Sequence, residues 1–110
     1  MKAVRLHDIY TASFPFLDSA EYKLRPVIVV SLPYGEHGIL AVVPLSSRAR
    51  PESVDFAISN WREAGLAKPS TARVHRVATI LQSKLASRLG SLKEDDVDKL
   101  QQSIRSFLGL

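Results

Sequence analysis

The chain has 110 residues, of which 45% are hydrophobic and 24% are charged, an ordinary composition for a folded globular protein. It has no cysteine, which excludes disulfides and thiolate metal sites. A net charge of +4 favours polyanions such as nucleic acids as partners. We expect one domain over residues 1–110, because this length supports a single modest core. We also expect a cytoplasmic protein with no membrane segment, since the N-terminus lacks the continuous apolar run of a signal peptide and no apolar run approaches the length of a membrane span.

The first expected strand runs from about Asp8 to Phe14 and ends at Pro15. The loop that follows carries Phe16 and Tyr22 among charged residues, a composition typical of loops that contact a ligand. The two rings could equally pack over the open end of a barrel, and the sequence leaves both interpretations open.

The strongest strand signal is the run of four β-branched residues 27–30, directly after Arg25 and Pro26. Such a short apolar run predicts a strand that is buried on both faces. Pro26 has no N–H, so we expect it at the first position of this strand. It also favours an extended conformation for Arg25. The pattern therefore predicts a permanent positive charge at the end of a rigid strand.

A second apolar run, residues 39–47, follows a turn-rich segment with two glycines and a proline. Two strands joined by so short a loop predict an antiparallel hairpin. If the turn centres on residues 35–36, Arg25 lies opposite Ser46, and a register shift of one or two residues leaves it beside Pro44, Ser46 or Ser47. We therefore expect a guanidinium next to hydroxyl groups at the end of the sheet away from the turn.

The second half of the chain gives shorter signals. Alternation predicts a half-buried strand over 54–58 and another over 71–80, and residues 82–90 fit either a short helix or a turn with a short strand. Trp61 is expected to pack, with base stacking as the alternative. The basic loop 48–53 fits a solvated turn or a phosphate contact.

The last element is predicted to be an amphipathic helix on the sheet. Ser91 and Glu94 have the spacing of a capping box, and acids at 94–96 complement the positive end of a helix dipole. Gly109 follows as an end signal. The apolar residues, spaced as one helical face, are Val97, Leu100, Ile104 and Phe107.

Several short segments of this chain follow one another in the order seen in a known protein family. The most specific of them are Arg25–Ser31 and Val43–Ser47. The others are Asp8-Ile9, Phe14-Pro15-Phe16, Gly65-Leu66, Lys68-Pro69-Ser70, Arg73-Val74, Thr79-Ile80 and Leu89-Gly90. Together they resemble the MazF/PemK-like toxins of type II toxin–antitoxin systems.

The resemblance implies a mainly β fold, an SH3-like β-barrel with a C-terminal helix, in a homodimer. It implies a metal-independent endoribonuclease that cuts single-stranded mRNA at a short sequence and needs no cofactor. A cognate antitoxin would block the active groove with its C-terminal segment. By resemblance the catalytic residues are Arg25 and Ser46. Three positions depart from the family pattern: Ser46 stands for a threonine, His7 for a glycine and His75 for an acid.

Metal-free RNA cleavage uses the 2′-hydroxyl as nucleophile, so the protein must supply proton transfer and stabilise a crowded phosphorane. The planar guanidinium of Arg25 suits the second task, and Ser46 can donate a hydrogen bond to phosphate. The general base stays open among His7, His37, His75, Asp18, Glu21 and Arg25 itself. The residues expected to bind RNA are Phe16, Tyr22, Ser47, Arg48, Lys68, Arg73 and Arg76.

Other interpretations remain at this point. Arg25 could instead form an ion pair with Asp18 or Glu21 that fixes its loop. The fold could carry a non-enzymatic toxin that inhibits DNA gyrase, or a module that grips RNA or a peptide without cutting it.

Overall fold

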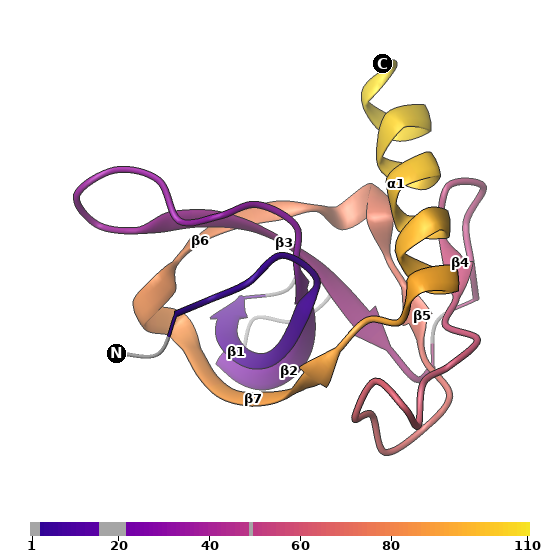
Figure 1. Cartoon of the computed structure of the whole chain (residues 1–110), viewed down its shortest axis with the longest axis horizontal. Coiled ribbons are helices and arrows are strands. Elements are labelled where there is room, and N and C mark those ends of the chain that lie inside the picture. Colours follow the sequence, from indigo (N-terminus) through magenta and orange to yellow (C-terminus); the bar gives the residue numbers. More distant parts are fainter. Residues whose placement is uncertain (1–2, 16–21, 49) are drawn as a thin grey trace.

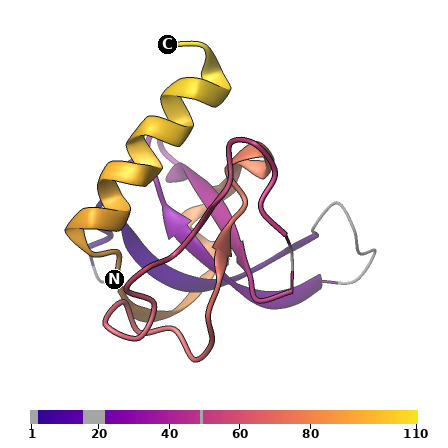
Figure 2. The same cartoon turned by 90° about the vertical axis from the view of Figure 1, so that its right-hand side faces the viewer.

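The computed structural model describes residues 3–15, 22–48 and 50–110. They form a strongly curled sheet with one helix lying against its outer side (Figures 1 and 2). The elements are β1 (Asp8–Pro15), β2 (Tyr22–Val29), β3 (Ile39–Ser46), β4 (Phe56–Ala57), β5 (Thr71–Ala72), the 3₁₀ turn η1 (Val74–Arg76), β6 (Ala78–Leu81), the 3₁₀ turn η2 (Gln82–Lys84), β7 (Leu85–Ser91) and α1 (Glu94–Leu108).

Every strand pair is antiparallel, and the sheet order is β4-β5-β3-β2-β1-β7, with β6 also paired to β3. The predicted mainly β fold with a C-terminal helix is confirmed. The barrel is not closed by the strand pairs of the described residues, since none of them joins β6 to β7.

The central hairpin has the predicted register. Val27 pairs with Pro44 and Val29 with Val42. The same register, continued by two residues away from the hairpin turn, sets Arg25 opposite Ser46. The prediction that Pro26 begins the strand is wrong, because β2 already starts at Tyr22. Pro26 instead lies where β2 pairs with β1 alone, just before the part paired with β3, a position that tolerates a missing N–H.

Burial on both faces of β2 is also confirmed. Ile28 belongs to the larger apolar cluster, which includes Leu100 of α1, so this cluster lies between the sheet and the helix. Val27 belongs to a second cluster on the opposite face with Leu40 and Ile80. Successive residues of a strand point to opposite faces, which is why the β-branched run fills both clusters.

The strand predicted over 71–80 is interrupted, so that prediction is wrong. From Val42 to Leu45, β3 advances three residues, while the facing chain advances six, from Ala78 back to Ala72. The extra residues form η1, whose Val74 is fully buried in the larger cluster. Burial of that side chain holds the interruption in place.

Two other short elements refine the sequence reading. The half-buried strand predicted over 54–58 is reduced to the two residues of β4. For 82–90, the turn-and-strand alternative is correct, as η2 and β7.

The helix begins at Glu94 and its acidic first turn is confirmed, but the capping box is wrong. Ser91 is held in β7 opposite Asp8, and the N-cap residue is Lys93, which makes no side-chain capping bond. Gly109 ends the helix in a left-handed conformation, as predicted. The predicted apolar face is buried at Leu100 but 42% exposed at its far end, Phe107. No helix in the described ranges is long and apolar enough to cross a membrane.

The backbone of the turn before β1 explains why the family pattern has a glycine at the position of His7. His7 has φ 72°, a left-handed conformation that costs an L-residue about 1–2 kcal/mol and glycine almost nothing. Its backbone N–H donates to Val29 and its carbonyl accepts from Leu92, so neighbouring strands fix the conformation. A glycine at this position would therefore be the unstrained choice.

Candidate active site

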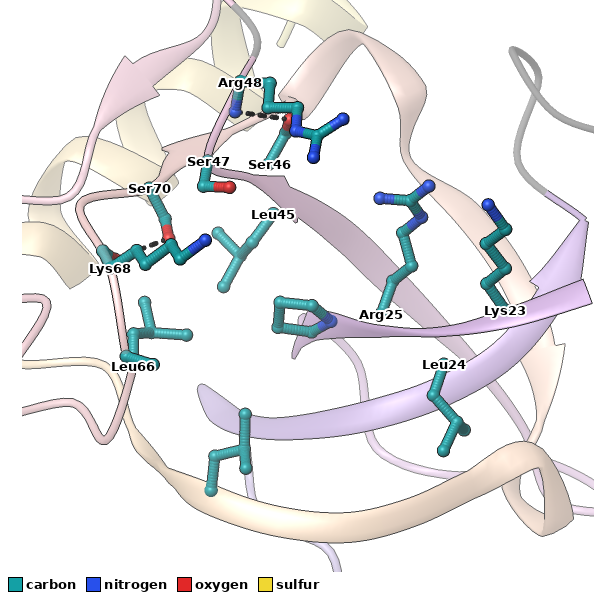
Figure 3. A pocket seen from close by; sticks show the side chains of 13 residues that line it. Lys23, Leu24, Arg25, Leu45, Ser46, Ser47, Arg48, Leu66, Lys68 and Ser70 are labelled. Carbon is teal, nitrogen blue, oxygen red and sulfur yellow. Dashed lines mark hydrogen bonds between the residues drawn. The ribbon is translucent and has the colours of Figure 1, made fainter.

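A cleft of about 510 Å³ opens where β2 and β3 meet the segment 66–70 and β7 (Figure 3). Four of its lining residues are cations: Lys23, Arg25, Arg48 and Lys68. None of its described lining residues is an aspartate, glutamate or histidine. The remaining lining residues are Leu24, Pro26, Leu45, Ser46, Ser47, Leu66, Ala67, Ser70 and Leu89. The cleft therefore has the electrostatic character of a polyanion site.

Arg25 of β2 and Ser46 of β3 both line this cleft, just beyond the part in which the two strands pair, so the predicted juxtaposition is present. Figure 3 shows the guanidinium of Arg25 and the side chains of Ser46 and Arg48 around the same space. The Ser46 hydroxyl oxygen accepts the Arg48 N–H at 3.2 Å, which ties the hydroxyl to the start of the basic loop. A hydroxyl can both accept and donate hydrogen bonds, so Ser46 is able to act toward a phosphate as a donor.

The wall opposite β2 depends on a contact between two glycines. Gly65 has φ 93°, and a Cβ on it would lie 2.1 Å from the carbonyl oxygen of Leu89. A Cβ on Gly90 would lie 2.2 Å from the carbonyl oxygen of Ala64. Only glycine at both positions lets the two backbones approach so closely. The contact brings Leu66, next to Gly65, into the same cleft as Leu89.

A buried carboxylate ties the start of this wall to α1. Asp96 is fully buried and accepts the backbone N–H groups of Ser59 and Asn60, each at 2.9 Å. Lys99 lies 3.7 Å from the same carboxylate. Nearer the cleft, the Ser70 hydroxyl donates to the Lys68 carbonyl at 2.9 Å. The segment that carries Lys68 is thus bonded at both ends, so its cation sits on a defined backbone.

Five of the residues expected at the site meet in this cleft, while Arg73 and Arg76 are not among its described lining residues. Those that line it are Arg25, Ser46, Ser47, Arg48 and Lys68. Arg76 is part of η1 and lies outside the described lining. Phe16 lies outside the described residues, and Tyr22 is described only as backbone of β2.

Arg73 points to a different cluster, around Asp55. Its Nε lies 3.9 Å from Asp55 Oδ2, its side chain is 14% exposed, and this Nε has no hydrogen-bond partner among the described residues. The Asp55 side chain is fully buried and lies 2.8 Å from His75 Nδ1. Because a carboxylate only accepts, the proton of this bond sits on His75.

The Asp55 pKa reflects two opposed causes. Burial raises this pKa, but hydrogen bonds from the His75 ring and from the N–H groups of Glu52 and His75 together lower it by a larger amount. The pKa of Asp55 is therefore below its ordinary value. Asp55 is therefore an ionised anchor that joins the loop before β4 to η1, and His75 is occupied there.

Apart from Arg25, no candidate for the general base lines the cleft in the described part of the chain. His7 lines a separate groove against α1 with Leu6 and Ile104, where burial lowers its pKa. His37 is an exposed residue of the hairpin turn. Asp18 and Glu21 lie outside the described residues. Within those residues, no three histidine or acidic side chains gather to form a metal site.

Sequence reasoning missed the apolar half of the lining and Lys23. Leu66 and Leu89 each adjoin one of the contacting glycines, but the sequence gives no sign that these two segments meet. Lys23 could have been found from strand alternation, because it lies two residues from Arg25 on β2 and therefore on the same face. Trp61 packs against the larger cluster, as expected, with Arg62 4.9 Å from its ring.

Comparison with known proteins gives a consistent family. The family model described as PemK-like, MazF-like toxin of type II toxin-antitoxin system matches residues 5–108. A search of curated proteins found no match.

Solved structures share the fold at low sequence identity. An endoribonuclease from a mycobacterial species, solved in complex with its cognate antitoxin, is 18% identical with a TM-score of 0.76, covering 98% of this chain and 97% of its own. The Mycobacterium tuberculosis toxin MazF-mt6 is 23% identical with a TM-score of 0.73, covering 94% and 97%. MazF from Deinococcus radiodurans is 16% identical with a TM-score of 0.74 and full coverage of both chains, 100% each.

Proposed function

Because the chain belongs to the PemK-like, MazF-like toxin family of type II toxin–antitoxin systems, we propose that it is an endoribonuclease. It cuts single-stranded mRNA at a short sequence without a metal ion. The observation that carries this proposal is the cleft in which Arg25 faces Ser46 among four cations, with no acid among the described lining residues.

The reaction is a transphosphorylation within the RNA. The 2′-oxygen forms a bond to phosphorus as its proton leaves, and the bond from phosphorus to the 5′-oxygen breaks as that oxygen gains a proton. The products are a 2′,3′-cyclic phosphate and a 5′-hydroxyl. Arg25 stabilises the extra negative charge of the phosphorane through its planar fork of N–H groups, and Ser46 assists by hydrogen bonding to a phosphate oxygen.

The remaining cations of the cleft bind the phosphates on either side. Lys23, Arg48 and Lys68 are all exposed and surround the same space as Arg25. Each phosphate that they neutralise releases counterions, so affinity should fall with salt. The general base is left among Asp18, Glu21 and Arg25 itself.

The proposed protein partners are a cognate antitoxin and a second copy of the chain. A type II toxin is neutralised by a protein antitoxin, and an acidic antitoxin segment would complement the cationic cleft. The mycobacterial endoribonuclease above was solved with its cognate antitoxin, and a Deinococcus radiodurans MazF was solved with MazE. We propose that the toxin itself is a homodimer.

The test is an RNA digest in excess EDTA with mapped product ends. Wild-type protein should cut single-stranded RNA at one short sequence and leave 5′-hydroxyl ends. Arg25→Ala should lose about 100- to 1000-fold in rate, the usual cost of removing a group that stabilises the developing charge. Arg62→Ala is the matched control, since Arg62 is exposed and lies on Trp61 outside the cleft lining.

Three results would contradict the proposal. If cleavage requires added metal, the metal-independent mechanism is wrong. If Arg25→Ala and Arg62→Ala retain equal activity in folded protein, Arg25 has no part in the chemistry. RNA binding without any cleavage would reduce the protein to a binding module.

A further inference from the structure

The cleft has a cationic side and an apolar side, and the apolar side has no role in the cleavage chemistry. Leu24 is 61% exposed and Leu89 is 37% exposed, although both line a cleft rich in cations. Leu66, which is only 8% exposed, also lines the cleft, on the wall supported by the two glycines. Apolar surface that stays exposed beside charged groups is a recurrent mark of a binding surface.

The two sides follow from strand alternation in β2. Lys23 and Arg25 project to one face of the strand and Leu24 to the other, and Figure 3 shows this separation. Residues two apart on a strand are about 6.6 Å apart along it. This is comparable with the separation of neighbouring phosphates in an extended RNA strand. Cations at this spacing can therefore bind successive phosphates.

Each end of the cleft combines a cation with a leucine. At one end Lys23 adjoins Leu24 in the chain, and at the other Lys68 lies close in sequence to Leu66 (Figure 3). A single-stranded nucleotide likewise combines a phosphate with the apolar face of an unpaired base. In a duplex those base faces are stacked and hidden, so only a single strand can use both sides of the cleft.

We propose that the leucine side seats the bases on either side of the phosphate bound by Arg25. Leu24 contacts one flanking base, and Leu89 together with Leu66 contacts the other. The inference rests on the proposed endoribonuclease function and makes its substrate more specific. The cleft selects unpaired nucleotides by burying base faces, while the cations bind the backbone without reading sequence.

The test measures binding separately from cleavage. A short oligoribonucleotide that spans the cut site, with a 2′-deoxy nucleotide at that site, is titrated by fluorescence anisotropy in EDTA. The same oligonucleotide is then made abasic at one flanking position at a time. Each flanking abasic site removes one base face from contact with the leucines, so it should weaken binding by about fivefold or more.

The decisive comparison is between variants. With Leu24→Ala, one flanking abasic site should cost less than twofold, and Leu89→Ala should have the same effect for the other flank. Leu32→Ala is the matched control, because Leu32 is 56% exposed but lies outside the cleft lining, and it should keep the wild-type cost at both positions. Unfolding curves of each variant establish that the fold persists.

Four outcomes overturn the proposal. One is an abasic cost that is the same in all three leucine variants. A second is a change in sedimentation mass caused by Leu24→Ala alone, which would assign this leucine to a contact between copies. A third is competition by an acidic, apolar peptide that depends on Leu24 while abasic sites cost nothing, which would assign the leucines to a protein ligand. Failure of every oligonucleotide to bind is a fourth, and it also removes the endoribonuclease proposal.

Discussion

Replacing Gly65 by alanine tests the wall of the cleft through a known steric conflict. The new Cβ would lie 2.1 Å from the Leu89 carbonyl oxygen, whereas real Cβ atoms stay at least 3.0 Å from such neighbours, so the wall must retreat by about 0.9 Å. The left-handed φ of 93° adds conformational strain of about 1–2 kcal/mol. Overpacking adds about 1–3 kcal/mol, so we expect a total cost of about 2–5 kcal/mol.

Gly35→Ala separates the two causes. Gly35 has φ 80°, but nothing lies within 4 Å of its ideal Cβ, so this substitution should cost only the conformational strain. Urea unfolding of both variants therefore gives the steric part as a difference of about 1–3 kcal/mol. A domain of this size is commonly stable by about 5–15 kcal/mol, so both variants should still fold.

The same pair of variants reports on function. A retreat of the wall moves Leu66 and Lys68 relative to Arg25, and misplacement by about 1 Å can cost about 100-fold in rate. We expect folded Gly65→Ala to lose most RNA cleavage and Gly35→Ala to keep it. Equal unfolding free energies for the two variants would refute the close backbone contact, whatever the activities.

Three further predictions use other features of the structure. His7→Gly should raise the unfolding free energy by about 0.5–1 kcal/mol, measured in urea, because it relieves a left-handed residue. The lowered pKa of Asp55 stabilises the fold above its unfolded pKa of about 3.9 and is lost as pH falls through the folded pKa. Asp55→Asn should thus be less stable at pH 7 and lose less stability between pH 5 and 3. For RNA binding, four phosphate contacts predict that log affinity falls against log salt concentration with a slope of about −3. Lys68→Ala should reduce the magnitude of this slope by about 0.7, while Arg62→Ala leaves it unchanged.

Sequence alone determined the parts of this protein whose partners are close in the chain. The hairpin of β2 and β3 has the register expected from its turn, because a short loop between two alternating runs leaves few ways to pair them. From that register followed the meeting of Arg25 and Ser46. The helix and its end at Gly109 were likewise local, since apolar periodicity and a left-handed cap need no distant partner.

Tertiary structure decided whatever depends on segments far apart in the chain. Ser91 has the sequence pattern of a helix N-cap, but it pairs with Asp8 in the sheet instead. The strand after Thr71 is interrupted because the side chain of Val74 is buried in the core. Leu66 and Leu89 line the same cleft because the backbones at Gly65 and Gly90 are in close contact. The sequence of neither segment predicts this contact. Local patterns fix local geometry, but which distant surfaces meet is settled only when the whole core packs.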